Sequence, residues 1–209
     1  MAPERTPFYR LAQNLLKLGF STLQGMRVEG LEHVPAEGGC LIVSNHTSWL
    51  DPPVLGCSLT HRQIHFMAKR ELFERPYLGK VIRWLGAFPV ERGQADRKSL
   101  RMALNLLTSG RVVCLFPEGT RGDGQKMEPW HVGMAMLAHN AQVDVIPAAL
   151  VRTRNLLEDR QLHLPRQPMR VRFGPAISTQ AISGPSKARL AEIQERCYQG
   201  VEALLVEMR

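Results

Sequence analysis

Apolar and polar positions along the chain follow two periods, one typical of strands and one typical of helices. Short, almost continuous apolar runs bounded by turn residues predict buried strands at residues 40–44, 63–68, 111–116, 144–151 and 169–173. Between these runs, apolar residues recur at helical spacing and predict helices at residues 52–59, 76–85, 96–107, 132–140 and 186–208. Strands that alternate with helices indicate an α/β fold, so we expect a mixed, largely parallel central sheet flanked by helices.

The first segment, residues 8–24, has helical periodicity and a wide apolar face. Its polar face carries the cations Arg10 and Lys17 and no acid, as in a helix that lies in the interface of a bilayer. The same periodicity fits an amphipathic helix that packs its apolar face on the domain's own core. The pattern does not decide between the two, because it does not show which apolar phase the helix meets.

The composition is that of a globular domain, with 44% hydrophobic and 22% charged residues among 209. This balance excludes a disordered, collagen-like or coiled-coil chain. Lysine and arginine together number 27 against 19 acidic residues, which leaves a net charge of +8. Such an excess of positive charge favours anionic partners: nucleic acid, an anionic membrane surface or a phosphorylated substrate.

The cysteines and the start of the chain bear on the compartment. The four cysteines form no CxxC pair and three of them lie in apolar runs, as is typical of buried thiols in a reducing compartment. The first residues lack the apolar stretch and cleavage site of a signal peptide, and no uncharged apolar run reaches the roughly 18 residues of a spanning helix. We therefore expect any membrane contact to be peripheral, at the cytoplasmic face.

One candidate for catalysis follows the first buried strand, in the segment NHTSWLDPP. Pro52 fits the first turn of a helix, and Asp51 before it is a favourable N-cap. A loop of this length can bring the Asp51 carboxylate to one imidazole nitrogen of His46, as for the base of a catalytic triad. No GxSxG motif occurs, so the nucleophile would be the substrate's own hydroxyl. The alternative is that Asp51 only caps the helix and His46 is an ordinary loop histidine.

Basic residues follow two of the predicted strands and a third, shorter strand end at residues 86–92. Arg121 lies in the loop PEGTRG after residues 111–116, Arg92 ends the segment GAFPVER, and Lys69 follows residues 63–68. Arginine matches phosphate oxygens with a planar fork, and the glycines of the first loop allow backbone N–H groups to approach a ligand closely. Each cation alone is more often a solvated surface charge, but three at strand ends indicate a phosphate site.

The ordered segments NHTSWLD, GAFPVER, FPEGTRG and VIPAAL resemble the four sequence blocks of the lysophosphatidate (glycerolipid) acyltransferase family, over residues 30–151. The resemblance implies transfer of a fatty acyl group from acyl-CoA or acyl-carrier protein to the sn-2 hydroxyl of lysophosphatidate, giving phosphatidate at a membrane phospholipid surface. It implies no metal and no cofactor. We expect residues 1–28 to form a membrane-association segment and residues 29–209 the catalytic domain.

The resemblance also assigns roles to individual residues. It places the catalytic base on His46 and the carboxylate that orients it on Asp51. It assigns binding of the acceptor to Arg121, Glu118, Gly119, Thr120, Arg92 and Lys69. The chain departs from the family at two positions: Gly122 follows the arginine where many members have serine, and His131 lies where members often have lysine. These departures leave the chemistry in place and concern the identity of the acceptor.

Three other functions fit part of the pattern. The acceptor could be another lysolipid, such as one with an amino-acid head group. The same histidine and aspartate could activate water in a thioesterase or lipid hydrolase. A basic module that binds anionic lipid or nucleic acid without catalysis rests on charge alone. We expect no nucleic-acid partner, because aromatic residues make up only 6% and do not alternate with basic runs.

Overall fold

The structure is a computed structural model that describes residues 5–91, 96–154, 157–158, 161–162 and 167–208. Its centre is a seven-stranded sheet with the strand order β1-β9-β6-β2-β5-β3-β4. The strands are β1 (Met26–Glu29), β2 (Cys40–Ser44), β3 (Ile64–Lys69), β4 (Phe88–Val90), β5 (Val112–Leu115), β6 (Asp144–Val151) and β9 (Met169–Phe173). Neighbouring strands are parallel except β6 and β9, which are antiparallel, so the predicted mixed, largely parallel sheet is confirmed. A separate hairpin is formed by β7 (Leu157–Glu158) and β8 (Gln161–Leu162).

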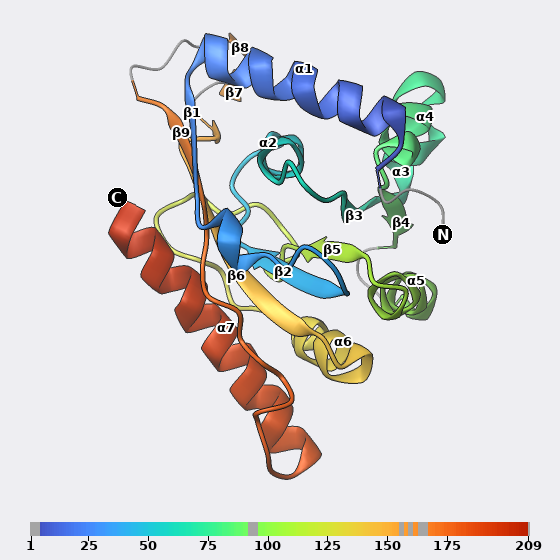
Figure 1. Ribbon diagram of the computed structural model, residues 1–209, viewed down its shortest axis with the longest axis vertical. Coiled ribbons are helices and arrows are strands. Elements are labelled where there is room, and N and C mark those ends of the chain that lie inside the picture. The colour runs from blue at the N-terminus through green and yellow to red at the C-terminus, as the bar shows by residue number, and fades with distance from the viewer. Residues whose placement is uncertain (1–4, 92–95, 155–156, 159–160, 163–166, 209) are drawn as a thin grey trace.

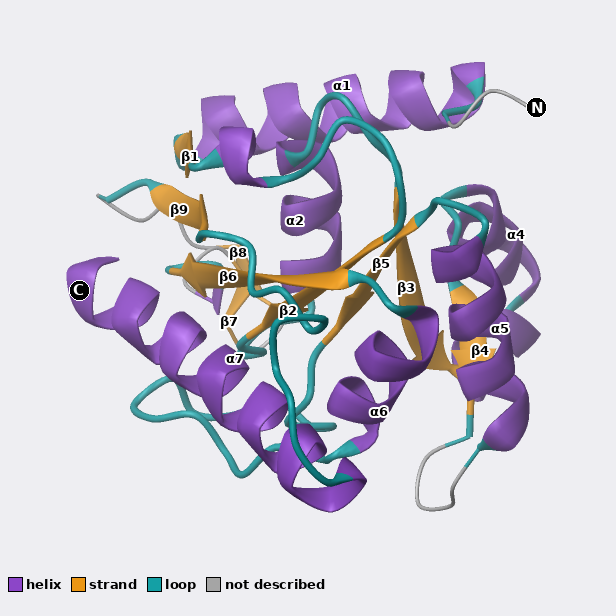
Figure 2. Ribbon diagram, turned by 60° about the horizontal axis from the view of Figure 1, so that its bottom comes forward, coloured by secondary structure: helices purple, strands orange, loops and turns teal. Residues whose placement is uncertain are grey.

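Helices cover both faces of the sheet (Figures 1 and 2). They are α1 (Pro7–Leu23), α2 (Asp51–Ser58), α3 (Arg70–Glu74), α4 (Pro76–Trp84), α5 (Arg97–Thr108), α6 (Gly133–Ala141) and α7 (Ser186–Met208), with a short 3-10 turn at Leu31–His33. The helices α1 and α2 pack on one face and α5, α6 and α7 on the other, whereas α3 and α4 lie beyond β3 and β4.

The central strand β2 shows why the buried strands have no polar alternation. Cys40 and Ile42 point into the apolar cluster under α1 and α2, whereas Leu41 and Val43 point into the cluster under α5, α6 and α7. A strand that is covered on both faces needs apolar residues at every position. This layering brings the carboxyl ends of β2, β3, β4 and β5 to one edge of the sheet, where ligands of such folds bind.

The N-terminal helix α1 packs on the domain and also leaves apolar side chains exposed. It buries Tyr9, Gln13 and Phe20 on the domain, which confirms that it docks on the core. A second apolar stripe of α1 is exposed, with Leu11, Leu15, Leu18 and Leu23 between 45% and 63% accessible. In the part of the chain that the structure describes, every helix is too short or too polar to cross a bilayer.

Candidate active site

The loop between β2 and α2 places His46 against Asp51. The His46 Nδ1 atom lies 2.8 Å from the Asp51 Oδ2 atom, and the imidazole ring stacks on Phe116 with 4.3 Å between ring centroids. Because a carboxylate only accepts, Nδ1 carries the proton and Nε2 keeps its lone pair. His46 is therefore held in the tautomer that can accept a proton at Nε2.

Asp51 does not cap the helix from the position before it, which corrects the expectation from the sequence. It is the first residue of α2, and Leu50 occupies the N-cap. Its Oδ2 atom accepts the backbone N–H groups of Thr47 at 2.7 Å and Ser48 at 2.8 Å in addition to His46 Nδ1. The physical reason is that Pro52 and Pro53 have no N–H, and the N–H of Val54 already donates to the carbonyl oxygen of Leu50 at 2.9 Å, so none is left for a cap by Asp51.

Thr153 completes the surroundings of Asp51 and was not singled out in the sequence. Its side chain is fully buried, and its hydroxyl donates to the Asp51 Oδ1 atom. The chain reaches this position because Arg152, directly after β6, adopts a left-handed φ of 65° that ends the strand in a turn. The two residues are 102 positions apart, so no local spacing signal could have joined them.

Two of the predicted phosphate-binding cations share a cavity with His46. Lys69 at the end of β3 and Arg121 in the loop after β5 line this cavity, which has a volume of about 250 Å³. The Arg121 guanidinium lies over the indole ring of Trp49, 4.2 Å from its centroid. Gly119 also lines the cavity and has a φ of 69°, a left-handed conformation that glycine adopts without strain.

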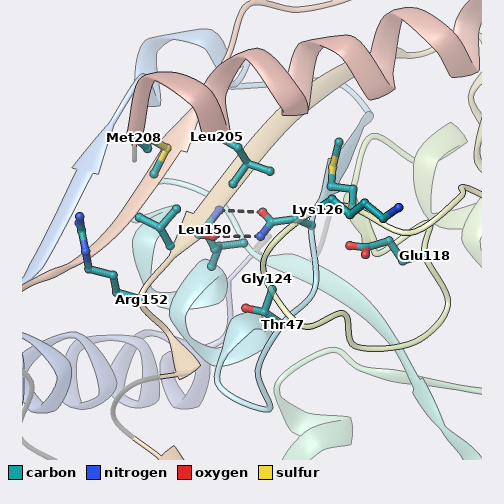
Figure 3. A pocket seen from close by; sticks show the side chains of 11 residues that line it. Thr47, Glu118, Gly124, Lys126, Leu150, Arg152, Leu205 and Met208 are labelled. Carbon is teal, nitrogen blue, oxygen red and sulfur yellow. Dashed lines mark hydrogen bonds between the residues drawn. The ribbon is translucent and has the colours of Figure 1, made fainter.

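The other predicted acceptor residues lie elsewhere. Thr120 is exposed and lines neither the cavity of His46 nor that of Glu118. Arg92 lies outside the described residues. Glu118 is buried and lines a second cavity with Thr47 and Lys126 (Figure 3). The structure therefore does not bring the side chains of Thr120 and Glu118 into the cavity of Arg121.

Glu118 instead joins the two loops of the site. Its Oε1 atom accepts the backbone N–H of His46 at 2.8 Å, and its Oε2 atom accepts the backbone N–H of Glu128 at 3.0 Å. Burial raises the pKa of the Glu118 carboxyl above its usual range. The Glu118 side chain thus connects the loop after β5, which also carries Arg121, to the loop of His46. It does so from the second cavity and not from the cavity that His46 and Arg121 line.

An apolar cavity of about 360 Å³ adjoins the His46 cavity. It lies among α1, α2 and α4, and it shares the lining residues Trp49, Pro52, Met67, Ala68 and Leu72 with the His46 cavity. The site therefore combines an imidazole held by a carboxylate, two cationic side chains and an adjacent apolar chamber.

Comparisons with known proteins agree with this description. The family model described as Acyltransferase matches residues 25–151. The 1-acyl-sn-glycerol-3-phosphate acyltransferase of Bacillus subtilis is 31% identical over 197 residues, 94% of this chain and 96% of that protein. The lyso-ornithine lipid O-acyltransferase of Pseudomonas aeruginosa is 32% identical over 122 residues, 58% of this chain and 46% of that protein.

A solved structure shows the same fold. The crystal structure of PlsC, the 1-acyl-sn-glycerophosphate acyltransferase of Thermotoga maritima, superimposes with a TM-score of 0.70 at 24% identity, covering 93% of this chain and 80% of that one. The fold and the site define an acyl-transferring enzyme of the α/β class. The chain belongs to the acyltransferase family.

Proposed function

We propose that this acyltransferase transfers a fatty acyl group from acyl-CoA or acyl-carrier protein to the sn-2 hydroxyl of lysophosphatidate, giving phosphatidate. The observation that carries the proposal is the position of His46, which Asp51 orients at 2.8 Å in a cavity that Arg121 and Lys69 also line. A base and an anion site in one cavity hold the reacting hydroxyl and the phosphate of one acceptor molecule together.

His46 acts as the general base in the proposed reaction. Its Nε2 atom accepts the proton of the acceptor hydroxyl while the hydroxyl oxygen bonds to the thioester carbon. The carbon–sulfur bond then breaks, and the proton passes from Nε2 to the departing sulfur, so the products are the ester and a free thiol. A positioned base of this kind contributes about 10²- to 10⁴-fold to the rate. Neither a metal nor a cofactor is needed.

Arg121 and Lys69 bind the acceptor phosphate in this proposal. Stacking on Trp49 fixes the plane of the Arg121 guanidinium, which leaves its N–H fork free to contact phosphate oxygens. Lys69 adds a point charge from β3 on the same cavity. The apolar cavity beside them accommodates a fatty acyl chain, because its lining is almost entirely apolar and it opens into the His46 cavity.

Residues 1–28 form the peripheral membrane segment in this proposal. The docked side of α1 holds it on the domain, and the exposed leucines on its other side contact the bilayer interface. Such an enzyme reaches a lipid acceptor at the membrane surface and its donor from the cytoplasm.

A second acceptor class is a lysolipid with an amino-acid head group. One observation favours it: His131 lies against Gly119, at 3.0 Å from where a Cβ of that residue would be, in place of the lysine that many family members carry. A neutral imidazole attracts a phosphate less strongly than a lysine ammonium does. The relative from Pseudomonas aeruginosa is named for such an acceptor.

The proposal is tested by incubating the purified protein with one acyl-CoA and a panel of lysolipids, and by measuring free thiol and the acylated lipid together. We expect phosphatidate from lysophosphatidate, loss of at least about 10²-fold of this activity in His46→Ala, and unchanged activity in the exposed-histidine control His61→Ala. Thiol release without any acceptor would indicate a hydrolase, and full turnover by His46→Ala would exclude His46 as the base.

A further inference from the structure

The helix α4 buries very little of itself. Of its nine residues only Gly79 is buried, where the helix closely approaches the backbone of Phe73. Its aromatic residues are exposed, Tyr77 at 85% and Trp84 at 59%, and Leu78 and Val81 are also exposed. A helix of nine residues is not stable in water by itself and needs packing contacts. A large exposed apolar patch of this kind is typical of a surface that contacts a partner.

This face is continuous with the exposed stripe of α1. Trp84 of α4 contacts Phe8 of α1 edge to face, with 5.0 Å between ring centroids, and α4 lies beside the N-terminal end of α1 (Figure 1). We call the combined area the α1–α4 surface. It consists of Phe8, Leu11, Leu15, Leu18, Tyr77, Leu78, Val81 and Trp84.

The charges around the α1–α4 surface indicate which partner it fits. Neither Pro7–Leu23 nor Pro76–Trp84 contains an acidic residue, whereas α1 carries Arg10 and Lys17 and α4 carries Lys80 and Arg83. A second copy of the chain packed on this surface would bring cations against cations. An anionic lipid surface attracts the same cations, and tryptophan and tyrosine are favoured at the level of lipid headgroups.

The apolar cavity reaches the surface at the same place. Leu78 and Val81 line the cavity and are also exposed, and Tyr9 and Leu16 of α1 line it from the other side. A chain in this cavity would therefore end next to the α1–α4 surface. A lipid layer is the partner that would supply or receive such a chain there.

We propose that α4 is a second membrane-contacting element, which together with α1 binds an anionic bilayer through Tyr77, Trp84 and the cation Lys80, whereas Arg83 packs over the ring of Phe73 at 4.8 Å from its centroid. The identity of the partner as a lipid layer rests on the proposed function, but binding requires no catalysis. The cleanest variant is Tyr77→Ser, because this exposed side chain makes no hydrogen bond or ring contact in the described part of the chain and its loss leaves the fold intact.

The experiment measures flotation of the full chain with vesicles of phosphatidylcholine containing about a third phosphatidylglycerol, and with pure phosphatidylcholine vesicles, where the cations contribute least. We expect the wild type to prefer the anionic vesicles. The double variant Tyr77→Ser with Trp84→Ser should weaken vesicle binding at least tenfold, and Tyr77→Ser alone should weaken it severalfold. Lys80→Glu should weaken binding to the anionic vesicles only. The matched control is Met102→Ser with Val206→Ser, two exposed apolar residues of α5 and α7, which should bind as the wild type does.

Three outcomes would overturn the proposal. Wild-type binding by Tyr77→Ser and by the double variant would leave α1 as the membrane contact and exclude α4. Equal binding of Lys80→Glu and the wild type to anionic vesicles would exclude the role of charge. A dimer in the absence of vesicles that the double variant abolishes would identify the surface as a contact between copies. His46→Ala should bind vesicles as the wild type does, so failure of the proposed catalysis is distinguishable from failure of this binding.

Discussion

Asp51 illustrates how single residues set up the site. Its carboxylate accepts hydrogen bonds from the His46 Nδ1–H group, from two backbone N–H groups and from the hydroxyl of Thr153. Its side chain is fully buried. A buried carboxylate is tolerated when its oxygens are hydrogen-bonded in this way. The four donors also hold the carboxylate in one orientation, and this orientation fixes the imidazole of His46.

At the residue scale we predict that Thr153→Val slows catalysis. The substitution keeps the side-chain shape and removes the hydroxyl, so Asp51 loses one of its four donors. A hydrogen bond to a charged group contributes about 1.5–3 kcal/mol, and we expect kcat to fall roughly tenfold or more while KM changes little. The measurement is the initial rate of acyl transfer at varied acceptor concentration.

Thr153→Ser restores the hydroxyl and should recover most of the lost kcat. The control is Thr179→Val, because Thr179 is also buried and donates to a backbone carbonyl, that of Val143, away from the site. A kcat for Thr153→Val equal to that of the wild type, or an equal loss in Thr179→Val, would contradict a role through Asp51.

Individual residues of the site differ in whether the sequence motifs predicted their position. The pairing of His46 with Asp51 was predicted, since five residues of separation in one loop leave few other arrangements. The joint cavity of Lys69 and Arg121 was predicted because parallel strands end at one edge of a sheet. The position of the Glu118 side chain was not predicted, because adjacent residues of a tight turn can face different cavities. Glu118 lines the second cavity, whereas Gly119 lines the cavity of His46.

Among the elements, α1 docks on the domain through a polar side chain as well as through Tyr9 and Phe20. It buries the polar side chain of Gln13, whose Nε2 atom donates to the carbonyl oxygens of Gly56 at 2.9 Å and Leu59 at 2.8 Å. These carbonyls belong to the C-terminal end of α2, where a helix has no partners of its own. Four leucines of α1 remain exposed, whereas Leu16 packs against the core. Gln13 therefore holds α1 on the domain with its second apolar stripe facing outward.

We predict that Gln13→Leu destabilises the fold. The substitution leaves the carbonyl of Leu59 without its donor in a buried place, and an unsatisfied group of this kind costs about 1–3 kcal/mol in the free energy of unfolding. Urea denaturation should show a lower midpoint than for the wild type. Asn14→Leu is the matched control, because Asn14 is the exposed neighbour and should change the free energy of unfolding by less than about 0.5 kcal/mol. Equal midpoints for Gln13→Leu and the wild type would show that α1 is held by other contacts.

At the scale of the whole molecule, the closed two-layer core determines how the thiols behave. All four cysteines are buried, as the apolar runs around three of them predict. Burial raises the pKa of Cys57 to about 12 and that of Cys197 to about 12. Burial and the nearby charge of Asp51 raise the pKa of Cys114 well above its usual range.

We predict that the folded protein does not react with Ellman's reagent at pH 8. A thiol attacks as the thiolate, which is scarce when its pKa is raised and is also out of reach in a packed core. In guanidinium chloride all four cysteines should react, so the absorbance change measures global unfolding. Rapid labelling of any thiol in the folded protein, before the loss of circular dichroism, would contradict this closed core.

The sequence by itself determined the alternation of strands and helices, the buried character of the central strands and the loop that pairs His46 with Asp51, because these depend on periods and spacings of a few residues. It left open which side of α1 faces the domain. It also contained no sign that Thr153 reaches Asp51, that Glu118 lies behind His46, or that α4 extends the surface of α1. Only the tertiary structure decided these, because each depends on contacts between segments that lie far apart along the chain.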